Sequence, residues 1–383
     1  MVSNVGNRRY VFSAVWPLTC GNAVPIRCGR KNFVIEPDSL SLYASDPVAA
    51  LRRIAFLMER RLEDTYKVQA FRKAASAILP LPIDEIHRRV ADGTLTQIAG
   101  VGASTAAVVT QAVEGLVPDR LLAAEAKYGG PLATNGGAVL EALRGDLHSH
   151  SDWSDGGSPI QEMAMTALEL GREYLALTDH SPRLRVANGL SAERLRKQLD
   201  IVDAINTHMD GFTLLKGIEV DILDDGTLDQ STEMLDLLDV RVASVHSKLA
   251  MDKTAMTKRM LAAVTTTRMN VLGHCTGRLV GGGRGRRPES QFDAKAVFDA
   301  CAEHGVAVEI NSRPERRDPP TRLLEMARDA GCLFSIDSDA HAPGQLDFPQ
   351  LGCERAEAAG IAPERIVNTW PMEELLAWAN PVR

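Results

Sequence analysis

Two periodicities divide the hydrophobic positions of this chain into two regions. Between about residues 46 and 128, apolar residues recur every three or four positions, as at Leu51, Ile54 and Met58, which is the period of an amphipathic helix. Asp46-Pro47 begins this region with an N-cap residue and a proline at the first helical position. From about residue 144, short apolar runs alternate with longer helical stretches. The pattern predicts an all-α region followed by an α/β region.

Seven runs of strand length are expected in the second region: residues 146–150, 173–179, 213–220, 239–246, 270–274, 306–311 and 333–339. Amphipathic segments lie between them, among them 160–170, 191–206 and 294–304. Strands that alternate with helices build a parallel sheet, and seven such units can close into a barrel. The predicted fold class is therefore α/β, a (β/α)7 barrel preceded by a small all-α domain.

The remaining segments complete the predicted organisation. Residues 1–45 show neither period and contain several turn-forming residues, so we expect a poorly structured extension there. Residues 129–143 contain two pairs of adjacent glycines and are predicted to be a linker. The expected division is an extension over 1–45, a helical domain over 46–128, a linker over 129–143 and a barrel over 144–383.

Composition limits the classes of function. The chain has 383 residues and a formal net charge of −7, which argues against nucleic-acid binding through bulk charge. Its six cysteines form no CxxC pair, which is typical of a reducing compartment without a disulfide framework. No apolar run approaches the roughly 18–20 residues that cross a bilayer. We expect a cytoplasmic protein with no membrane partner.

Polar side chains follow the predicted strands at their C-terminal ends. The set comprises His148, His150, Asp155, His180, Glu219, His246, His274, Asp339 and His341. The C-terminal strand ends of an α/β barrel meet at one face, where functional groups collect. Mixed imidazole and carboxylate ligands suit zinc, manganese or iron better than magnesium or calcium. Nine ligands are too many for one ion, so the set predicts a cluster of two or three metals. Any one member, taken alone, is equally explained as a satisfied core or loop group.

A glycine turn marks the helical region. Gly100-Val101-Gly102, with Ser104 on the following helix, resembles a helix-hairpin-helix motif, whose backbone amides at a helix N-terminus bind a DNA phosphate without reading bases. The alternative is an ordinary turn between packed helices. The surrounding residues resemble the N-terminal DNA-binding domain of family X DNA polymerases over about residues 46–128. Animal members use a lysine of this domain for lyase chemistry; the matching positions here are Ser104 and Val108, so lyase activity is not expected.

The strand-end motifs resemble the polymerase and histidinol phosphatase (PHP) domain, and most of all the copy at the C-terminus of bacterial family X polymerases. They are Asp146-Leu147-His148-Ser149-His150, Thr178-Asp179-His180-Ser181, Gly217-Ile218-Glu219-Val220-Asp221, Ser244-Val245-His246-Ser247, Gly273-His274-Cys275-Thr276-Gly277-Arg278 and Ser338-Asp339-Ala340-His341. The resemblance covers about residues 144–383. It implies a distorted (β/α)7, TIM-like barrel with a trinuclear site. One departure is Cys275, where relatives usually carry proline.

The same resemblance assigns ligands to each metal. His148, His150, Glu219 and Asp339 would hold the first metal, and Glu219, His246 and His274 the second, with Glu219 bridging the two. Asp155, His180 and His341 would hold the third. Family X polymerases also carry a nucleotidyl-transfer domain between the two resembling parts. Only about fifteen residues, 129–143, separate them here, so polymerase activity is not expected.

These features predict metal-dependent phosphoester hydrolysis. Glu219 is the expected bridging catalytic residue, and Arg278 is a candidate phosphate contact because a guanidinium matches phosphate oxygens; the alternative for Arg278 is a surface arginine. The basic loop 281–287 either follows a DNA backbone or is simply solvated. The leading hypothesis is a 3′–5′ exonuclease or 3′-end phosphatase acting on DNA in repair. The alternatives are a small-molecule phosphomonoesterase of the histidinol-phosphatase type and, third, a non-catalytic DNA-binding scaffold.

Overall fold

A computed structural model describes residues 37–265, 268–283 and 285–381 of the chain. Its described residues form two compact units. One takes in the chain up to Ile54 together with Gln69–Ala123, and the other takes in Ala55–Val68 together with the chain from Ala124. Most of the expected extension, residues 1–36, lies outside the described residues.

The helical region contains five helices: α1 (Pro47–Glu59), α2 (Thr65–Ile78), α3 (Ile83–Ala91), α4 (Ala103–Val113) and α5 (Asp119–Tyr128). A short 3₁₀ helix, η2 (Leu95–Gln97), precedes the glycine turn. Asp46 caps α1 as expected, because its Oδ1 accepts a hydrogen bond from the Ala49 amide at 2.9 Å. Leu51 and Ile54 are fully buried, which confirms the apolar face predicted from their spacing.

The expectation of no fixed structure before residue 46 is wrong for its last residues. Residues Pro37–Ala44 form a 3₁₀ helix, η1, which packs against α4. The turn formers in this segment concealed the signal. Tyr43 and Ala44 are partly buried, and this packing stabilises a short helix whose sequence shows no sustained period.

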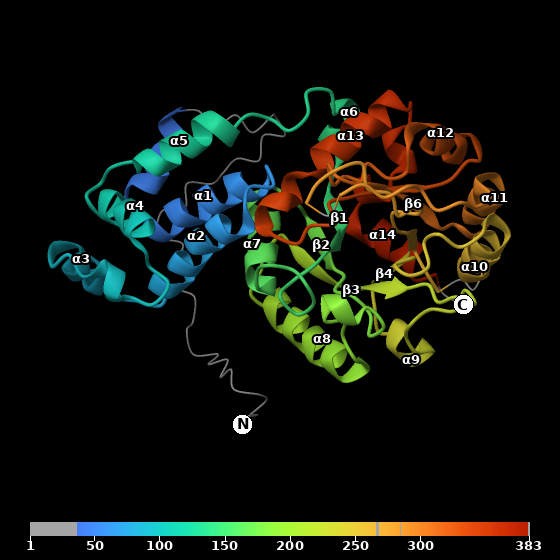
Figure 1. Ribbon diagram of the computed structural model, residues 1–383, viewed down its shortest axis with the longest axis horizontal. Helices are drawn as coiled ribbons and strands as arrows, with labels where there is room; N and C mark the ends of the chain where they lie inside the picture. Colours follow the sequence, from blue (N-terminus) through green and yellow to red (C-terminus); the bar gives the residue numbers. More distant parts are fainter. Residues whose placement is uncertain (1–36, 266–267, 284, 382–383) are drawn as a thin grey trace. The chain divides into compact units, whose positions relative to one another are not determined.

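The second region is a seven-stranded parallel sheet in which every strand pairs with its neighbours in the sequence (Figure 1). The strands are β1 (Gly145–Ser149), β2 (Tyr174–Leu177), β3 (Thr213–Asp221), β4 (Val240–Ser244), β5 (Val271–Leu272), β6 (Ala307–Asn311) and β7 (Phe334–Asp337). All seven were predicted. The intervening and following helices are α7 (Ile160–Glu169), α8 (Ala192–Asn206), α9 (Thr232–Leu235), α10 (Lys253–Thr265), α11 (Ala294–His304), α12 (Thr321–Asp329), α13 (Pro349–Ala358) and α14 (Met372–Ala379). The fold is a nearly closed α/β barrel, as predicted.

The barrel closes between β1 and β7 mainly through side chains. Asp337 Oδ1 accepts a hydrogen bond from the Leu147 amide at 2.9 Å, and Asp146 Oδ1 accepts one from the Ser338 amide at 3.2 Å. Burial and repulsion from Asp337 raise the pKa of Asp146 to about 7. Burial and repulsion from Glu309 raise the pKa of Asp337 to about 6. Two buried carboxyl groups therefore join the strands directly beneath the C-terminal face.

The predicted linker contains a helix, α6 (Gly137–Ala142), so that part of the expectation is wrong. Val139 is buried in the barrel core, and its amide donates to Glu357 Oε1 on α13 at 2.8 Å. The two adjacent glycines, 136 and 137, suggested a loop, although the residues after them are good helix formers. Among the described residues, no helix is both long and apolar enough to cross a bilayer.

Candidate metal centre

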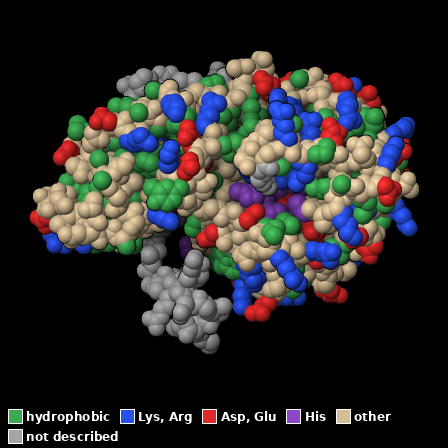
Figure 2. Space-filling model, viewed as in Figure 1, with side chains coloured by type: hydrophobic (Ala, Val, Ile, Leu, Met, Phe, Trp, Pro, Cys, Tyr) green, Lys and Arg blue, Asp and Glu red, His purple; other side chains and the backbone are tan. Residues whose placement is uncertain are grey.

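The nine predicted ligands converge at the C-terminal face of the barrel. Glu219 lies within β3, and His148 lies within β1; the other seven follow the ends of their strands or, like Asp155, lie on the loop after β1. Short strands that end at the same face bring residues nearly two hundred positions apart into contact. Figure 2 shows the histidine side chains in a hollow on the surface of the barrel.

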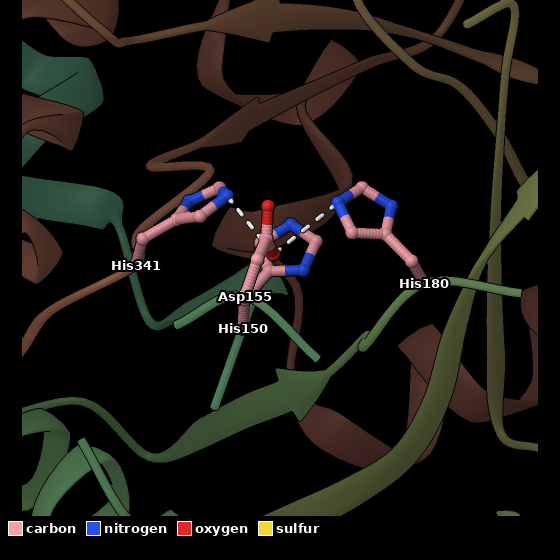
Figure 3. Close-up of side chains that lie close together, drawn as sticks. All are labelled: His150, Asp155, His180 and His341. Carbon is pink, nitrogen blue, oxygen red and sulfur yellow. Dashed lines mark ion pairs between the residues drawn. The ribbon is translucent and has the colours of Figure 1, made fainter. Parts of the chain in front are cut away.

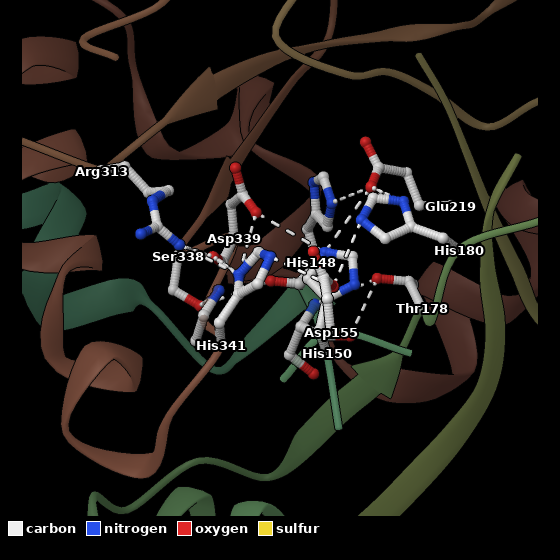
Figure 4. A network of polar contacts seen from close by, with 12 residues as sticks. His148, His150, Asp155, Thr178, His180, Glu219, Arg313, Ser338, Asp339 and His341 are labelled. Carbon is white, nitrogen blue, oxygen red and sulfur yellow. Dashed lines mark hydrogen bonds and ion pairs between the residues drawn. The ribbon is translucent and has the colours of Figure 1, made fainter. Parts of the chain in front are cut away.

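Glu219 lies beside His180 and faces the other histidines of the cluster (Figure 4). Its carboxylate is 1% exposed and has five histidine nitrogens within 3.5 Å. Its Oε1 is 2.9 Å from His274 Nε2 and 3.1 Å from His246 Nε2. Its Oε2 is 2.9 Å from His180 Nδ1. A carboxylate between imidazoles on both of its oxygens is arranged as a bridging ligand would be.

Three groups of side chains have donor atoms close enough together to hold an ion: His150, Asp155, His180 and His341; His148, His150 and Asp339; His180, Glu219 and His246. The first group is the most open, since Asp155 is 36% exposed and His341 is 21% exposed (Figure 3). Asp155 Oδ1 lies 3.5 Å from both His180 Nε2 and His341 Nε2. The second and third groups are mostly buried, so the cluster is exposed to solvent mainly on the side of Asp155.

The donor set passes a test of fit for transition metals. Six ring nitrogens in the cluster are buried and make no hydrogen bond of acceptable geometry: Nε2 of His148, both nitrogens of His150, Nδ1 of His180, Nε2 of His246 and Nδ1 of His274. A buried polar atom without a partner is costly and is uncommon in native proteins. Four of the six, on His148, His150, His180 and His246, lie within 3.5 Å of the Glu219 carboxylate. Bound cations would satisfy these four nitrogens together. The assignment of each side chain to a particular ion stays a prediction.

The buried histidines differ in their protonation. Burial lowers the pKa of His150 and His274 to about 3, helped by His341 and by Arg316 respectively. Burial also acts on His246, but the carboxylates of Glu219 and Asp221 outweigh it and raise its pKa to about 9. Likewise, Glu219 and Glu309 raise the pKa of His148 well above its ordinary value despite burial. Two histidines are therefore neutral in the metal-free protein, and two carry a proton.

Carboxylates behind the cluster orient the histidine rings, and their roles were not recognised in the sequence. Glu309 is fully buried on β6; its Oε1 lies 2.6 Å from His148 Nδ1, and its Oε2 accepts from the His274 amide. Asp221 Oδ1 contacts His246 Nδ1 in the same way. Such contacts fix which nitrogen of a ring faces the metal. A charged residue inside the apolar run 306–311 was the available signal for Glu309.

Two of the predicted ligands have a strained backbone. Asp339 has φ 50° and His274 has φ 21°, although neither is glycine. Residues other than glycine adopt positive φ rarely and at an energetic cost, and such residues concentrate at functional sites. Here the conformation turns each side chain toward the cluster immediately after its strand.

The three arginines near the cluster are in different situations. Arg278, the predicted phosphate contact, donates to the carbonyl oxygens of Arg316 and Arg317, and its Nη1 lies 3.6 Å from Glu289. It braces the loop after β6 in this structure, and its role as a phosphate contact stays a prediction. Arg316 is buried, donates to Asp339 Oδ2 at 2.9 Å and leaves its Nη1 without a partner. Arg313 donates to the Asp339 carbonyl oxygen at 2.8 Å.

The predicted hairpin is formed within the helical unit. Gly100 has φ 96°, Val101 is buried, and Gly102 is the N-cap of α4. The Gly102 amide donates to Thr105 Oγ1 at 3.0 Å, so this amide is not available to a ligand. The amides of Ala103 and Ser104 in the first turn of α4 have no acceptor among the described residues. These two are the donors left to bind a phosphate.

Comparison with known proteins agrees with both parts of the chain. Residues 44–115 match the helix-hairpin-helix domain family, and residues 146–313 match the PHP domain family, so Asp339 and His341 lie beyond the matched segment. The chain is 37% identical over 239 residues to the DNA polymerase/3′-5′ exonuclease PolX of Bacillus subtilis. The aligned segment covers 62% of this chain and 41% of that protein. The probable phosphatase YcdX of Escherichia coli is 29% identical over 237 residues, or 59% of this chain and 90% of that protein.

Two solved histidinol phosphatases also resemble the chain. The one from Listeria monocytogenes, described as putative, has 15% identity and a TM-score of 0.41, and covers 53% of this chain and 97% of that one. The one from Lactococcus lactis has 18% identity and a TM-score of 0.40, and the match covers 57% of this chain and 95% of that one. The conclusion rests on the matched domains and on the barrel: this chain is a PHP-domain protein with a helix-hairpin-helix domain, and it resembles the bacterial family X polymerase/exonuclease without a polymerase palm between the two domains.

Proposed function

We propose that this protein is a metal-dependent phosphoesterase that acts on DNA ends, as a 3′–5′ exonuclease or a 3′-end phosphatase in repair. One observation carries the proposal. Five histidine nitrogens lie within 3.5 Å of the buried carboxylate of Glu219, and this cluster opens to solvent at Asp155. The proposed ligands are the nine residues predicted from the sequence, and the proposed cofactors are two or three zinc, manganese or iron ions.

Each part of the cluster has a task in this scheme. Metals bound here would supply an activated water and positive charge for in-line displacement at phosphorus. Glu219 holds the two buried groups together. Asp339 is ionised although it is buried, because the guanidinium of Arg316 lowers the pKa of Asp339 well below its usual range. The exposed side chains, Asp155 and His341, form the part of the cluster that a phosphate reaches first. The barrel wall excludes bulk water from the side of His148.

A nucleic-acid substrate is favoured by the joining of the hairpin domain to the phosphoesterase barrel. The alternative is a small phosphomonoester, and the named activity of the Escherichia coli relative supports it, because that protein is covered almost completely. The near balance of eleven basic and ten acidic residues over 46–127 also weakens any preference for DNA based on charge. The aligned part of the chain spans less than half of the PolX relative, so the proposal covers phosphoester hydrolysis and does not include the polymerase activity named for that protein.

A metal-reconstituted assay separates these possibilities. The protein is supplied with zinc, manganese or iron and offered 5′-labelled single-stranded DNA, 3′-phosphorylated DNA and histidinol phosphate in parallel. We expect release of 3′-terminal nucleotides or of the 3′ phosphate to exceed hydrolysis of histidinol phosphate in kcat/KM. Faster hydrolysis of histidinol phosphate would favour the alternative. Absence of hydrolysis on all three substrates after full metal loading would exclude a phosphoesterase of either kind.

A further inference from the structure

The loop after His180 forms a closed, rigid projection beside the open part of the metal cluster. We call residues 181–189 the His180 loop. Its ends are held together, because the Leu190 amide donates to the His180 carbonyl oxygen at 2.7 Å. A Cβ at Gly189 would lie 1.9 Å from the Ser181 carbonyl oxygen, so the turn requires glycine there. The loop is therefore a closed turn, and it begins at the residue after His180, a predicted ligand.

The His180 loop is also tied to the loop that carries Asp155. Arg194 Nη1 donates to the Asn188 carbonyl oxygen at 2.7 Å, and Arg194 Nη2 donates to the Trp153 carbonyl oxygen. Asn188 Nδ2 donates to the same Trp153 oxygen at 3.0 Å. Trp153 precedes Asp155 by two residues, so these bonds place the His180 loop at the rim of the most exposed ligand group.

The loop presents one apolar and two cationic side chains to solvent. Val186, in the 3₁₀ turn η3 (Arg185–Ala187), is 94% exposed, more than any other large hydrophobic residue reported as exposed. Arg183 and Arg185 are exposed, and among the described residues neither guanidinium has a hydrogen bond or an ion pair. The charge of Arg183 reaches Asp224, but Asp224 is paired with Lys248 at 2.5 Å. A closed turn that exposes the side chain of Val186 and the guanidinium groups of Arg183 and Arg185 is suited to a ligand that has both apolar faces and phosphates.

We propose that the His180 loop binds the strand of a polynucleotide whose terminal phosphoester lies in the metal cluster. The two arginines contact backbone phosphates upstream of the reacting one, and Val186 packs against a base or sugar. This inference rests on the proposed function and makes it more specific. A single-stranded polynucleotide spans both the cluster and the loop, whereas a free phosphomonoester occupies only the cluster. The loop thereby selects for a polymer without touching the reacting phosphorus.

The test compares two substrates on matched variants of the full chain loaded with the same metal. The substrates are a twelve-nucleotide oligothymidylate and p-nitrophenyl phosphate, which reports general damage to the metal centre. The variants are Arg183→Gln with Arg185→Gln, Val186→Ser, and Arg196→Gln as a control, since Arg196 is an exposed arginine on α8 that makes no hydrogen bond or ion pair with its side chain among the described residues. We expect the double arginine variant to raise KM for the oligonucleotide about tenfold relative to p-nitrophenyl phosphate, and the control to leave this ratio unchanged.

Salt provides an independent readout. Each phosphate contact on a single strand contributes about 0.7 to the slope of log affinity against log salt, so the double variant should lose about 1.4 from that slope. Val186→Ser should weaken oligonucleotide binding without changing the slope. If oligonucleotide KM and its salt slope match those of the unaltered protein, the loop does not bind the strand, even though hydrolysis continues. If neither substrate is hydrolysed by the unaltered protein, the proposed function itself fails, and that result is distinct.

Discussion

Glu219→Gln tests the metal scheme most directly. The substitution keeps the size of the side chain and removes one negative charge from a position that is 1% exposed and lies between five histidines. Burial alone would raise the pKa of Glu219, but His246, His148 and His180 lower it well below the ordinary value. The carboxylate is therefore ionised at neutral pH, and its replacement removes a full charge from between the two proposed buried metals.

The expected loss is at least about 10³-fold in kcat, which corresponds to about 4 kcal/mol of transition-state stabilisation. A metal contribution to charge stabilisation is of this order, several kcal/mol. His341→Ala should cost less, because His341 is 21% exposed and belongs to a group with three other donors. Binding of DNA by the helical domain should be retained, giving a variant that binds without hydrolysis.

The assay measures single-turnover hydrolysis of labelled DNA at a metal content verified by elemental analysis. Glu233→Gln is the matched control, since Glu233 is an exposed glutamate on α9. If Glu219→Gln hydrolyses DNA at a near-normal rate with the same metal content, a bridging carboxylate is not needed, and a one-metal or metal-independent route must replace the scheme. If only metal content falls and the rate per bound metal is unchanged, the role of Glu219 is retention of metal.

Three further predictions concern other parts of the molecule. Arg194→Ala removes the hydrogen bonds that join the His180 loop to the carbonyl oxygen of Trp153, next to the group of His150, Asp155, His180 and His341. We expect the affinity of this group for metal to fall by about 10–100-fold, measured as a lower metal content per chain than in Arg196→Ala. Protonated His246 stabilises the metal-free protein below pH 6.5, and this contribution is lost as pH rises through about 9. Thermal unfolding of the metal-free protein should show this loss. Calorimetry should show that metal binding releases protons and becomes tighter over the same pH range. Gly102→Val should weaken binding of all DNA sequences by about tenfold, because the added side chain stands beside the Ala103 and Ser104 amides and obstructs a phosphate there, and a hydrogen bond to a charged group contributes about 1.5–3 kcal/mol. A Cβ at Gly102 meets nothing within 4 Å, so the substitution fits without a clash, and unchanged affinity in a titration would remove the hairpin as the phosphate site.

The seven strands were predictable because each combines an apolar run with a polar residue at its C-terminal end. The same feature led to the nine candidate ligands, which the structure brings together at one face, since a strand end in a parallel barrel fixes where the next side chains lie. Helix α6 was not predictable from period, because its six residues include a single fully packed side chain, Val139. The orienting role of Glu309 was also hidden. Its partner, His148, is 161 residues away, and only the closed barrel brings the two to 2.6 Å.

The bracing role of Arg278 illustrates a different limit. A sequence shows that a guanidinium follows a ligand, but it does not show which acceptors surround it. In the structure, the carbonyl oxygens of Arg316 and Arg317 take its donors. By contrast, Arg183 and Arg185 follow His180, are exposed, and have no such acceptors in the part of the chain that the structure describes; they lie on a turn closed at Gly189. Whether an arginine can bind a ligand is thus decided by the backbone nearby.

The opposite pKa shifts within the cluster explain how so many buried polar groups are compatible with a stable fold. In the metal-free protein, the protons on His148 and His246 provide positive charge next to the ionised Glu219, so the carboxylate is not left unpaired. His150 and His274 are already neutral and present lone pairs. A metal ion bound here would replace one kind of positive charge by another and would displace the protons on His148 and His246.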